Sequence, residues 1–194
     1  MTVPRQLPNA ITIVRILCAP VFVWLLLADA GADGPLRWTA AALFVVAIAT
    51  DGIDGHIART HDIVTDLGKL LDPIADKVLT GCAFVGLSIL AELPWWVTIV
   101  VLVREIGITV YRFVVVSDHV LAAAWMGKLK TVAQAVALSL ALLPLASVVG
   151  DWIGWVNTVT MWIAVILTVA SGVDYVVSEV RARRSRAAGT GHAA

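Results

Sequence analysis

Four aspartates between residues 51 and 76 have a spacing that suits metal-dependent chemistry. Asp51 and Asp54 are three residues apart, and Asp72 and Asp76 are four apart. In a helix, either spacing places the two carboxylates on one face. If two such helix ends meet, four carboxylates converge, and like charges so close together need a cation between them. Carboxylate oxygens are ligands that suit Mg²⁺ and Mn²⁺, so the sequence predicts a divalent-metal site.

The composition indicates what must position these carboxylates. The 194 residues are 60% hydrophobic and 14% charged, with a mean hydropathy of +0.91, whereas soluble domains are about 45–50% apolar and about 25% charged. A membrane-spanning helix needs about 20 mostly apolar residues. We therefore expect an all-α, polytopic membrane protein with six transmembrane helices, at residues 9–28, 36–52, 72–91, 94–116, 128–149 and 152–177. Residues 1–180 would form a single domain, followed by a basic, disordered cytoplasmic tail at residues 181–194.

The basic residues predict the orientation of these helices. With the N-terminus in the cytoplasm, all of the 14 basic residues except Arg37 fall on the cytoplasmic side. The C-terminus and the four aspartates would then be cytoplasmic as well. A belt of tryptophans would mark the outer interface: Trp38, Trp95, Trp96, Trp152 and Trp155. The formal net charge of +0 and the lack of a basic domain argue against nucleic-acid binding.

The aspartates belong to a longer pattern, D-x-x-D-G-x-x-A-R-x8-G-x-x-x-D-x-x-x-D. Its fixed positions are Asp51, Asp54, Gly55, Ala58, Arg59, Gly68, Asp72 and Asp76. The pattern resembles the signature of the CDP-alcohol phosphotransferases, with every gap of the expected length. Six spans in about 200 residues also agree with the architecture of that family.

The resemblance implies phosphoryl transfer from a CDP-linked lipid, assisted by one or two Mg²⁺ or Mn²⁺ ions, in a homodimer. Asp51, Asp54 and Asp72 would hold the ions against the diphosphate. Asp76 lies one turn deeper in its helix and would be the general base for the incoming hydroxyl, and could also contact a metal. The residues implied to bind CDP-diacylglycerol are Gly55, Ala58, Arg59, Gly68 and Asn9.

Basic residues elsewhere bear on the acceptor alcohol. Arg104 and Arg112 are eight residues apart, so they share one helical face about two turns apart. An unpaired guanidinium at Arg104, near the middle of its span, would be costly. This basic set fits an acceptor that itself carries a phosphate. The candidate phosphate-binding residues are Arg104, Arg112 and Lys130, with Lys128 and Arg15 as weaker candidates.

Three further segments resemble the phosphatidylglycerophosphate synthases within the family. They are P-N-x-x-T-x-x-R from Pro8, R-E-I-x-I-x-x-x-R from Arg104, and G-K-x-K-T from Gly127. This resemblance implies that sn-glycerol 3-phosphate attacks CDP-diacylglycerol at the bacterial cell membrane, giving phosphatidylglycerol phosphate and CMP.

Alternatives remain at this point. The acceptor could be inositol phosphate, or phosphatidylglycerol itself, which would make cardiolipin. Arg104 could be neutralised by Glu105 or by an aspartate and only tie helices together, while Lys128 and Lys130 anchor the topology. A small metal transporter would also carry intramembrane carboxylates. It should, however, carry them through the whole depth of a pore, and the outer halves of these spans are nearly free of charge.

Overall fold

The computed structural model describes residues 7–60, 66–114 and 123–190, and the side chains within 12–50, 74–111 and 125–181. All regular secondary structure in these ranges is helical, as the sequence predicted. The helices are α1 (Leu7–Asp29), α2 (Pro35–Thr60), α3 (Asp66–Ile89), α4 (Trp95–Val114), α5 (Ala123–Leu142), the short α6 (Ala146–Val149) and α7 (Ile153–Thr190).

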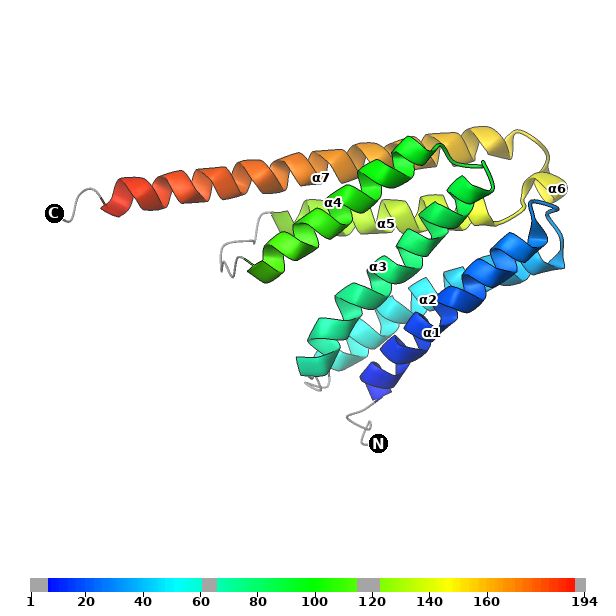
Figure 1. Cartoon of the computed structure of the whole chain (residues 1–194), viewed down its shortest axis with the longest axis horizontal. Helices are drawn as coiled ribbons and strands as arrows, with labels where there is room; N and C mark the ends of the chain where they lie inside the picture. Colours follow the sequence, from blue (N-terminus) through cyan, green and yellow to red (C-terminus); the bar gives the residue numbers. More distant parts are fainter. Residues whose placement is uncertain (1–6, 61–65, 115–122, 191–194) are drawn as a thin grey trace.

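Successive long helices run in alternating directions, so the bundle has two distinct ends (Figure 1). The connections from α1 to α2, from α3 to α4, and from α5 through α6 to α7 lie at one end. We call it the tryptophan end, because α2, α4 and α7 begin there with Trp38, Trp95, Trp96, Trp152 and Trp155 in or beside their first turns. The opposite end, where α2 finishes and α3 begins, is the aspartate end.

The interior of the bundle is closely packed. The rings of Phe22 in α1 and Phe44 in α2 lie 5.5 Å apart. A Cβ added at Gly86 of α3 would lie 2.6 Å from Leu26 Cδ2, so these two helices approach more closely there than a larger residue would allow. Small residues that are fully buried line several contacts: Ala19, Ala40, Ala41, Ala83 and Ala137. Small residues at helix contacts are typical of helices that pack within a membrane.

Large apolar side chains cover much of the outside of the bundle, while polar side chains lie inside it. Trp24, Val103 and Trp155 each expose more than 60% of their surface, whereas Lys130 and Gln134 are buried. Soluble proteins rarely expose apolar surface on this scale. The distribution indicates a membrane protein.

Two stretches of the described residues are long and apolar enough to cross a membrane, Thr12–Asp29 in α1 and Ile153–Arg181 in α7. The all-helical fold is therefore confirmed, whereas the six-span arrangement stays a prediction. Helix α7 continues to Thr190, past the domain boundary predicted at residue 180, and that division also stays a prediction.

An ion pair fastens the tryptophan end. The buried Arg37 of α2 donates from Nη1 to Glu92 Oε1 at 2.8 Å and from Nη2 to Glu92 Oε2 at 2.5 Å. Its Nε also donates to the carbonyl of Leu142 at 2.8 Å, and its Nη2 to that of Ala141 at 3.0 Å. These carbonyls belong to the last turn of α5, where no intrahelical donor remains. Arg37 thus joins α2, the α3–α4 connection and α5.

Candidate active site

The aspartate pattern spans the last turns of α2 and the first turns of α3. Asp51 and Asp54 lie within α2, and Asp72 and Asp76 within α3, so both pairs have the helical backbone that their spacing requires. The two helices meet at the same end of the bundle (Figure 1). The side chains of residues 51–73 lie outside the described residues. The convergence of the four carboxylates therefore stays a prediction. It is consistent with the position of both aspartate pairs in helices that meet at one end of the bundle.

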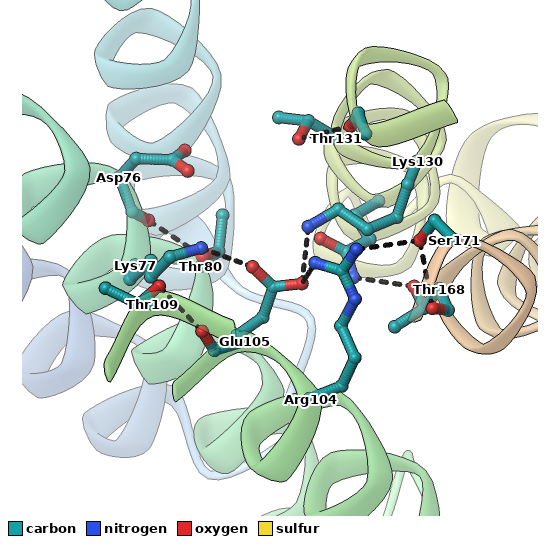
Figure 2. A network of polar contacts seen from close by, with 12 residues as sticks. Asp76, Lys77, Thr80, Arg104, Glu105, Thr109, Lys130, Thr131, Thr168 and Ser171 are labelled. Atoms are coloured by element: carbon teal, nitrogen blue, oxygen red, sulfur yellow. Dashed lines mark hydrogen bonds and ion pairs between the residues drawn. The ribbon is translucent and has the colours of Figure 1, made fainter. Parts of the chain in front are cut away.

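Asp76 is the one member of this set whose side chain is described, and it is partly buried. Its backbone carbonyl accepts a hydrogen bond from Thr80 Oγ1 at 2.7 Å within α3. Figure 2 shows Asp76 on α3 beside a network of charged side chains from three helices.

That network is centred on Glu105 of α4, which is 7% exposed. Its Oε1 accepts from Arg104 Nη1 at 2.9 Å and from Lys130 Nζ of α5, and its Oε2 accepts from Lys77 Nζ of α3 (Figure 2). We call Glu105, Lys77, Arg104 and Lys130 the Glu105 cluster. One carboxylate thus contacts three cationic groups among the side chains that the structure describes.

Helix α7 provides the remaining wall of the network. Arg104 Nη2 donates to Ser171 Oγ at 2.9 Å. A Cβ at Gly172 would lie 3.3 Å from Arg104 Cγ, so the arginine lies directly over this glycine. Gln134 of α5 donates to Thr168 Oγ1 of α7 at 2.8 Å. The guanidinium is held at a point where α4, α5 and α7 meet, although its buried Nε has no hydrogen-bond partner in the described part of the chain.

The structure separates the predicted acceptor-binding residues. Arg104 and Lys130 are brought together through Glu105, and Lys130 is only 4% exposed. Lys128, two residues earlier on α5, is exposed. Arg15 is buried in α1. Arg112 lies in α4, but its side chain falls outside the described residues.

The predicted donor-binding residues are placed by backbone alone. Asn9 lies in α1 and Gly68 in α3. The other three lie in α2: Gly55, Ala58 and Arg59. Their side chains belong to the part that is not described. Their roles stay predictions.

Three residues that make the ion pairs and hydrogen bonds of this cluster are absent from the predicted site residues: Glu105 itself, which was predicted only as a possible partner of Arg104, together with Lys77 and Ser171. Lys77 contacts Glu105 from α3, and Ser171 contacts Arg104 from α7. The sequence held a partial signal for Lys77 and for Ser171. Lys77 directly follows Asp76 in the sequence. Ser171 comes three residues after Thr168 in an otherwise apolar stretch, so these two hydroxyl side chains lie on one face of their helix.

The network includes the contact expected if Arg104 only ties helices together, since Arg104 does pair with Glu105. That interpretation, however, needs one carboxylate for one arginine. Here the same carboxylate also pairs with Lys130 and Lys77. Among the described side chains, these cations outnumber their counter-ions, and the excess is costly because Lys130 is buried and Arg104 and Lys77 are partly buried, so that water solvates them incompletely. The arrangement is therefore well suited to receive an anion.

Comparison with known proteins agrees with this chemistry. A sequence model of the CDP-alcohol phosphatidyltransferase family matches residues 5–170. A probable phosphatidylglycerophosphate synthase of Mycobacterium tuberculosis is 44% identical over 176 residues, which cover 91% of this chain and 82% of the relative. The CDP-diacylglycerol–glycerol-3-phosphate 3-phosphatidyltransferase of Bacillus subtilis is 38% identical over 88% of this chain and 93% of its own. A protein of the same name from Rickettsia bellii is 34% identical over 90% of this chain and 96% of the relative.

Proposed function

Because the chain belongs to the CDP-alcohol phosphatidyltransferase family, we propose that it transfers the phosphatidyl group of CDP-diacylglycerol to sn-glycerol 3-phosphate. The products are phosphatidylglycerol phosphate and CMP, so the protein is a transferase of phospholipid biosynthesis. Relatives named for this reaction match nearly the whole chain at 34–44% identity. The activity predicted from the sequence is thereby confirmed.

The Glu105 cluster is the observation that carries the choice of acceptor. Three cationic groups from α3, α4 and α5 share one carboxylate, which leaves two positive charges without a counter-ion among the described side chains. A phosphate monoester carries about that charge at neutral pH. An uncharged alcohol would leave the cations unneutralised.

The residues proposed to bind the acceptor phosphate are Arg104 and Lys130, with Arg112 on the same face of α4. A guanidinium can pair with two phosphate oxygens, whereas an ammonium acts as a point charge. Lys128 and Arg15 are weaker candidates, because Lys128 is exposed and Arg15 lies on α1.

The donor is proposed to bind at the aspartate end. Asp51, Asp54, Asp72 and Asp76 would hold one or two Mg²⁺ or Mn²⁺ ions, which supply positive charge against the diphosphate of CDP-diacylglycerol. The cytidine and phosphates would lie against the ends of α2 and α3, near Gly55, Ala58, Arg59 and Gly68, with Asn9 of α1 nearby.

The proposed chemical step is a single phosphoryl-group transfer. The acceptor hydroxyl forms a new ester bond to the lipid-bearing phosphorus, and the bond from that phosphorus to the bridging oxygen of CMP breaks. The hydroxyl proton passes to the carboxylate of Asp76. Asp76 lies on α3 next to Lys77 of the Glu105 cluster, so one helix would carry both the base and a residue of the acceptor site.

The setting proposed for this reaction is a bacterial cell membrane. Six helices would cross the bilayer, with both termini and the aspartate end in the cytoplasm, where a soluble acceptor meets a lipid donor. A homodimer, a single catalytic domain at residues 1–180 and a cytoplasmic tail at residues 181–194 complete the proposal. The apolar outer surface of the bundle supports the membrane setting.

The test is CMP release from CDP-diacylglycerol by the purified full chain with a panel of acceptors. Glycerol 3-phosphate should give CMP and a lipid product with a terminal phosphate monoester. Inositol phosphate and phosphatidylglycerol should give little of either. Product formation with inositol phosphate but not with glycerol 3-phosphate would agree with the family assignment but refute glycerol 3-phosphate as the acceptor.

A further inference from the structure

Glu105 divides its contacts between its two oxygens. Oε2 accepts from Lys77 of α3, while Oε1 accepts from both Arg104 and Lys130 (Figure 2). The two cations on Oε1 are those proposed to bind the acceptor phosphate. Lys77, on the other oxygen, lies on α3 and was not among the predicted site residues.

This division allows an anion to enter without releasing Glu105. A phosphate that accepts hydrogen bonds from Arg104 and Lys130 would replace only the contacts that these two side chains make with Oε1. The contact between Oε2 and Lys77 can persist throughout. Glu105 would then stay fixed to α3 while its neighbours turn toward the substrate.

The repulsion among the three cations of the Glu105 cluster also supports a positioning role for Glu105. Without a carboxylate among them, three cations from separate helices would repel one another strongly at low dielectric. Glu105 is 7% exposed and Lys130 4% exposed, so water screens this repulsion only weakly. The carboxylate holds the cations at one point before any substrate arrives.

We propose that Glu105, anchored by Lys77, is a positioning residue that assembles Arg104 and Lys130 into a phosphate-monoester site and exchanges part of its contacts for the phosphate. The proposal rests on the proposed function, because it takes the acceptor to be a phosphate monoester. It adds a role for Glu105 and Lys77, and it explains why the cluster carries more cations than one carboxylate can neutralise.

Glu105→Gln tests the proposal, because it keeps the shape of the side chain and removes its charge. The KM for glycerol 3-phosphate should rise roughly ten- to hundredfold, the worth of a charge-assisted hydrogen bond, and kcat should change less. The inhibition constant of inorganic phosphate, used as a competitor of the acceptor, should rise in parallel. The KM for CDP-diacylglycerol should stay the same. Glu105→Asp retains the charge on a shorter stem and should recover part of the loss.

Glu92→Gln is the matched control. Glu92 also neutralises a buried arginine, Arg37, but at the tryptophan end. This variant should lower the unfolding temperature and leave the acceptor KM unchanged. An equal rise of the acceptor KM in Glu92→Gln would mean that KM follows general destabilisation, and would overturn the proposal.

An unchanged or lower acceptor KM in a folded Glu105→Gln protein would also overturn it. If that variant does not fold, Lys77→Met decides: it removes the anchor and should raise the acceptor KM, and an unchanged KM refutes the positioning role. Lack of turnover of glycerol 3-phosphate by the unmutated protein would refute the proposed function, and this inference with it. Turnover by the unmutated protein with no response in the variants would refute the inference alone.

Discussion

Two arginines at different levels of the bundle have different surroundings. At the tryptophan end, Arg37 meets one carboxylate with two matched hydrogen bonds and donates its remaining capacity to carbonyls at the end of α5. In the middle of α4, Arg104 shares Glu105 with two lysines and leaves a buried Nε without a partner among the described residues. The first group is complete within the protein. The second has capacity left for a ligand.

The difference distinguishes a structural charge from a binding charge. A buried ion pair contributes to stability only when its geometry is good and its remaining donors are satisfied, and Arg37 meets both conditions. Arg104 is positioned equally firmly, by Glu105, Ser171 and Gly172, but its charge is not fully matched. A site of this kind trades some stability for pre-organisation.

Removal of divalent metal should produce the largest difference between the two ends. We expect chelation with excess EDTA to abolish CMP release and added Mg²⁺ or Mn²⁺ to restore it, while the Arg37–Glu92 pair at the tryptophan end, which holds no part of the aspartate pattern, is unaffected. Asp51→Asn, Asp54→Asn and Asp72→Asn should each weaken metal binding, since each removes a charged ligand. Full turnover in EDTA would contradict the metal site.

Asp76→Asn should separate chemistry from binding at the aspartate end. If Asp76 is the general base, turnover should fall by roughly 10²–10⁴-fold while CDP-diacylglycerol and metal still bind. Equilibrium binding of a CDP-diacylglycerol analogue, measured beside single-turnover rates, gives the two quantities separately. Loss of donor binding as severe as in Asp72→Asn would make Asp76 mainly a metal ligand.

Substitution of the two arginines tests the comparison directly. Arg104→Gln should raise the KM for glycerol 3-phosphate by roughly 10–100-fold, because one charge-assisted hydrogen bond is lost where little water can replace it. Arg104→Lys should recover only part, since an ammonium lacks the guanidinium fork. Arg37→Gln should leave this KM unchanged. It should lower the free energy of unfolding by roughly 2–3 kcal/mol, less than for a fully buried pair because Glu92 is one-third exposed.

The opposite pattern would refute the distinction between the two arginines. A folded Arg104→Gln protein with unaltered acceptor KM and reduced stability would make Arg104 structural, as Arg37 is. Denaturant unfolding and acceptor titration on the same preparations provide both readouts.

The helices were largely predictable from the sequence, because apolar stretches of sufficient length form helices in a membrane. The stretch predicted at residues 94–116 became Trp95–Val114, and the one at 9–28 became Leu7–Asp29. Hydropathy did not predict where α2 and α7 end. Both continue through polar residues, to Thr60 and Thr190, because backbone hydrogen bonds hold a helix regardless of side-chain polarity.

The site was predictable where its residues are close in sequence and not where they are distant. Glu105 and Arg104 are adjacent, so their pairing was foreseeable. The contacts of Glu105 with Lys77 and Lys130 join residues 28 and 25 positions apart, and they depend on how α3 and α5 are rotated against α4. That rotation is set by packing, such as the close approach of α1 and α3 at Gly86, which a pattern of residue types does not encode.

The rotation of α5 also determines the smallest expected change in the acceptor KM, that of a Lys128 variant. Lys128 and Lys130 are two residues apart and hence on different faces of the helix, with Lys130 buried against Glu105 and Lys128 exposed. Lys128→Gln should therefore change the acceptor KM by less than about fivefold, as expected for a solvated charge. Lys130→Gln should raise it by roughly ten- to hundredfold, because a buried charge-assisted contact is lost. Added salt should reduce the small effect of Lys128 and leave that of Lys130, since only exposed charges are well screened. Equal KM values for the two variants would mean that the acceptor is drawn in by overall positive charge rather than held by the buried cluster.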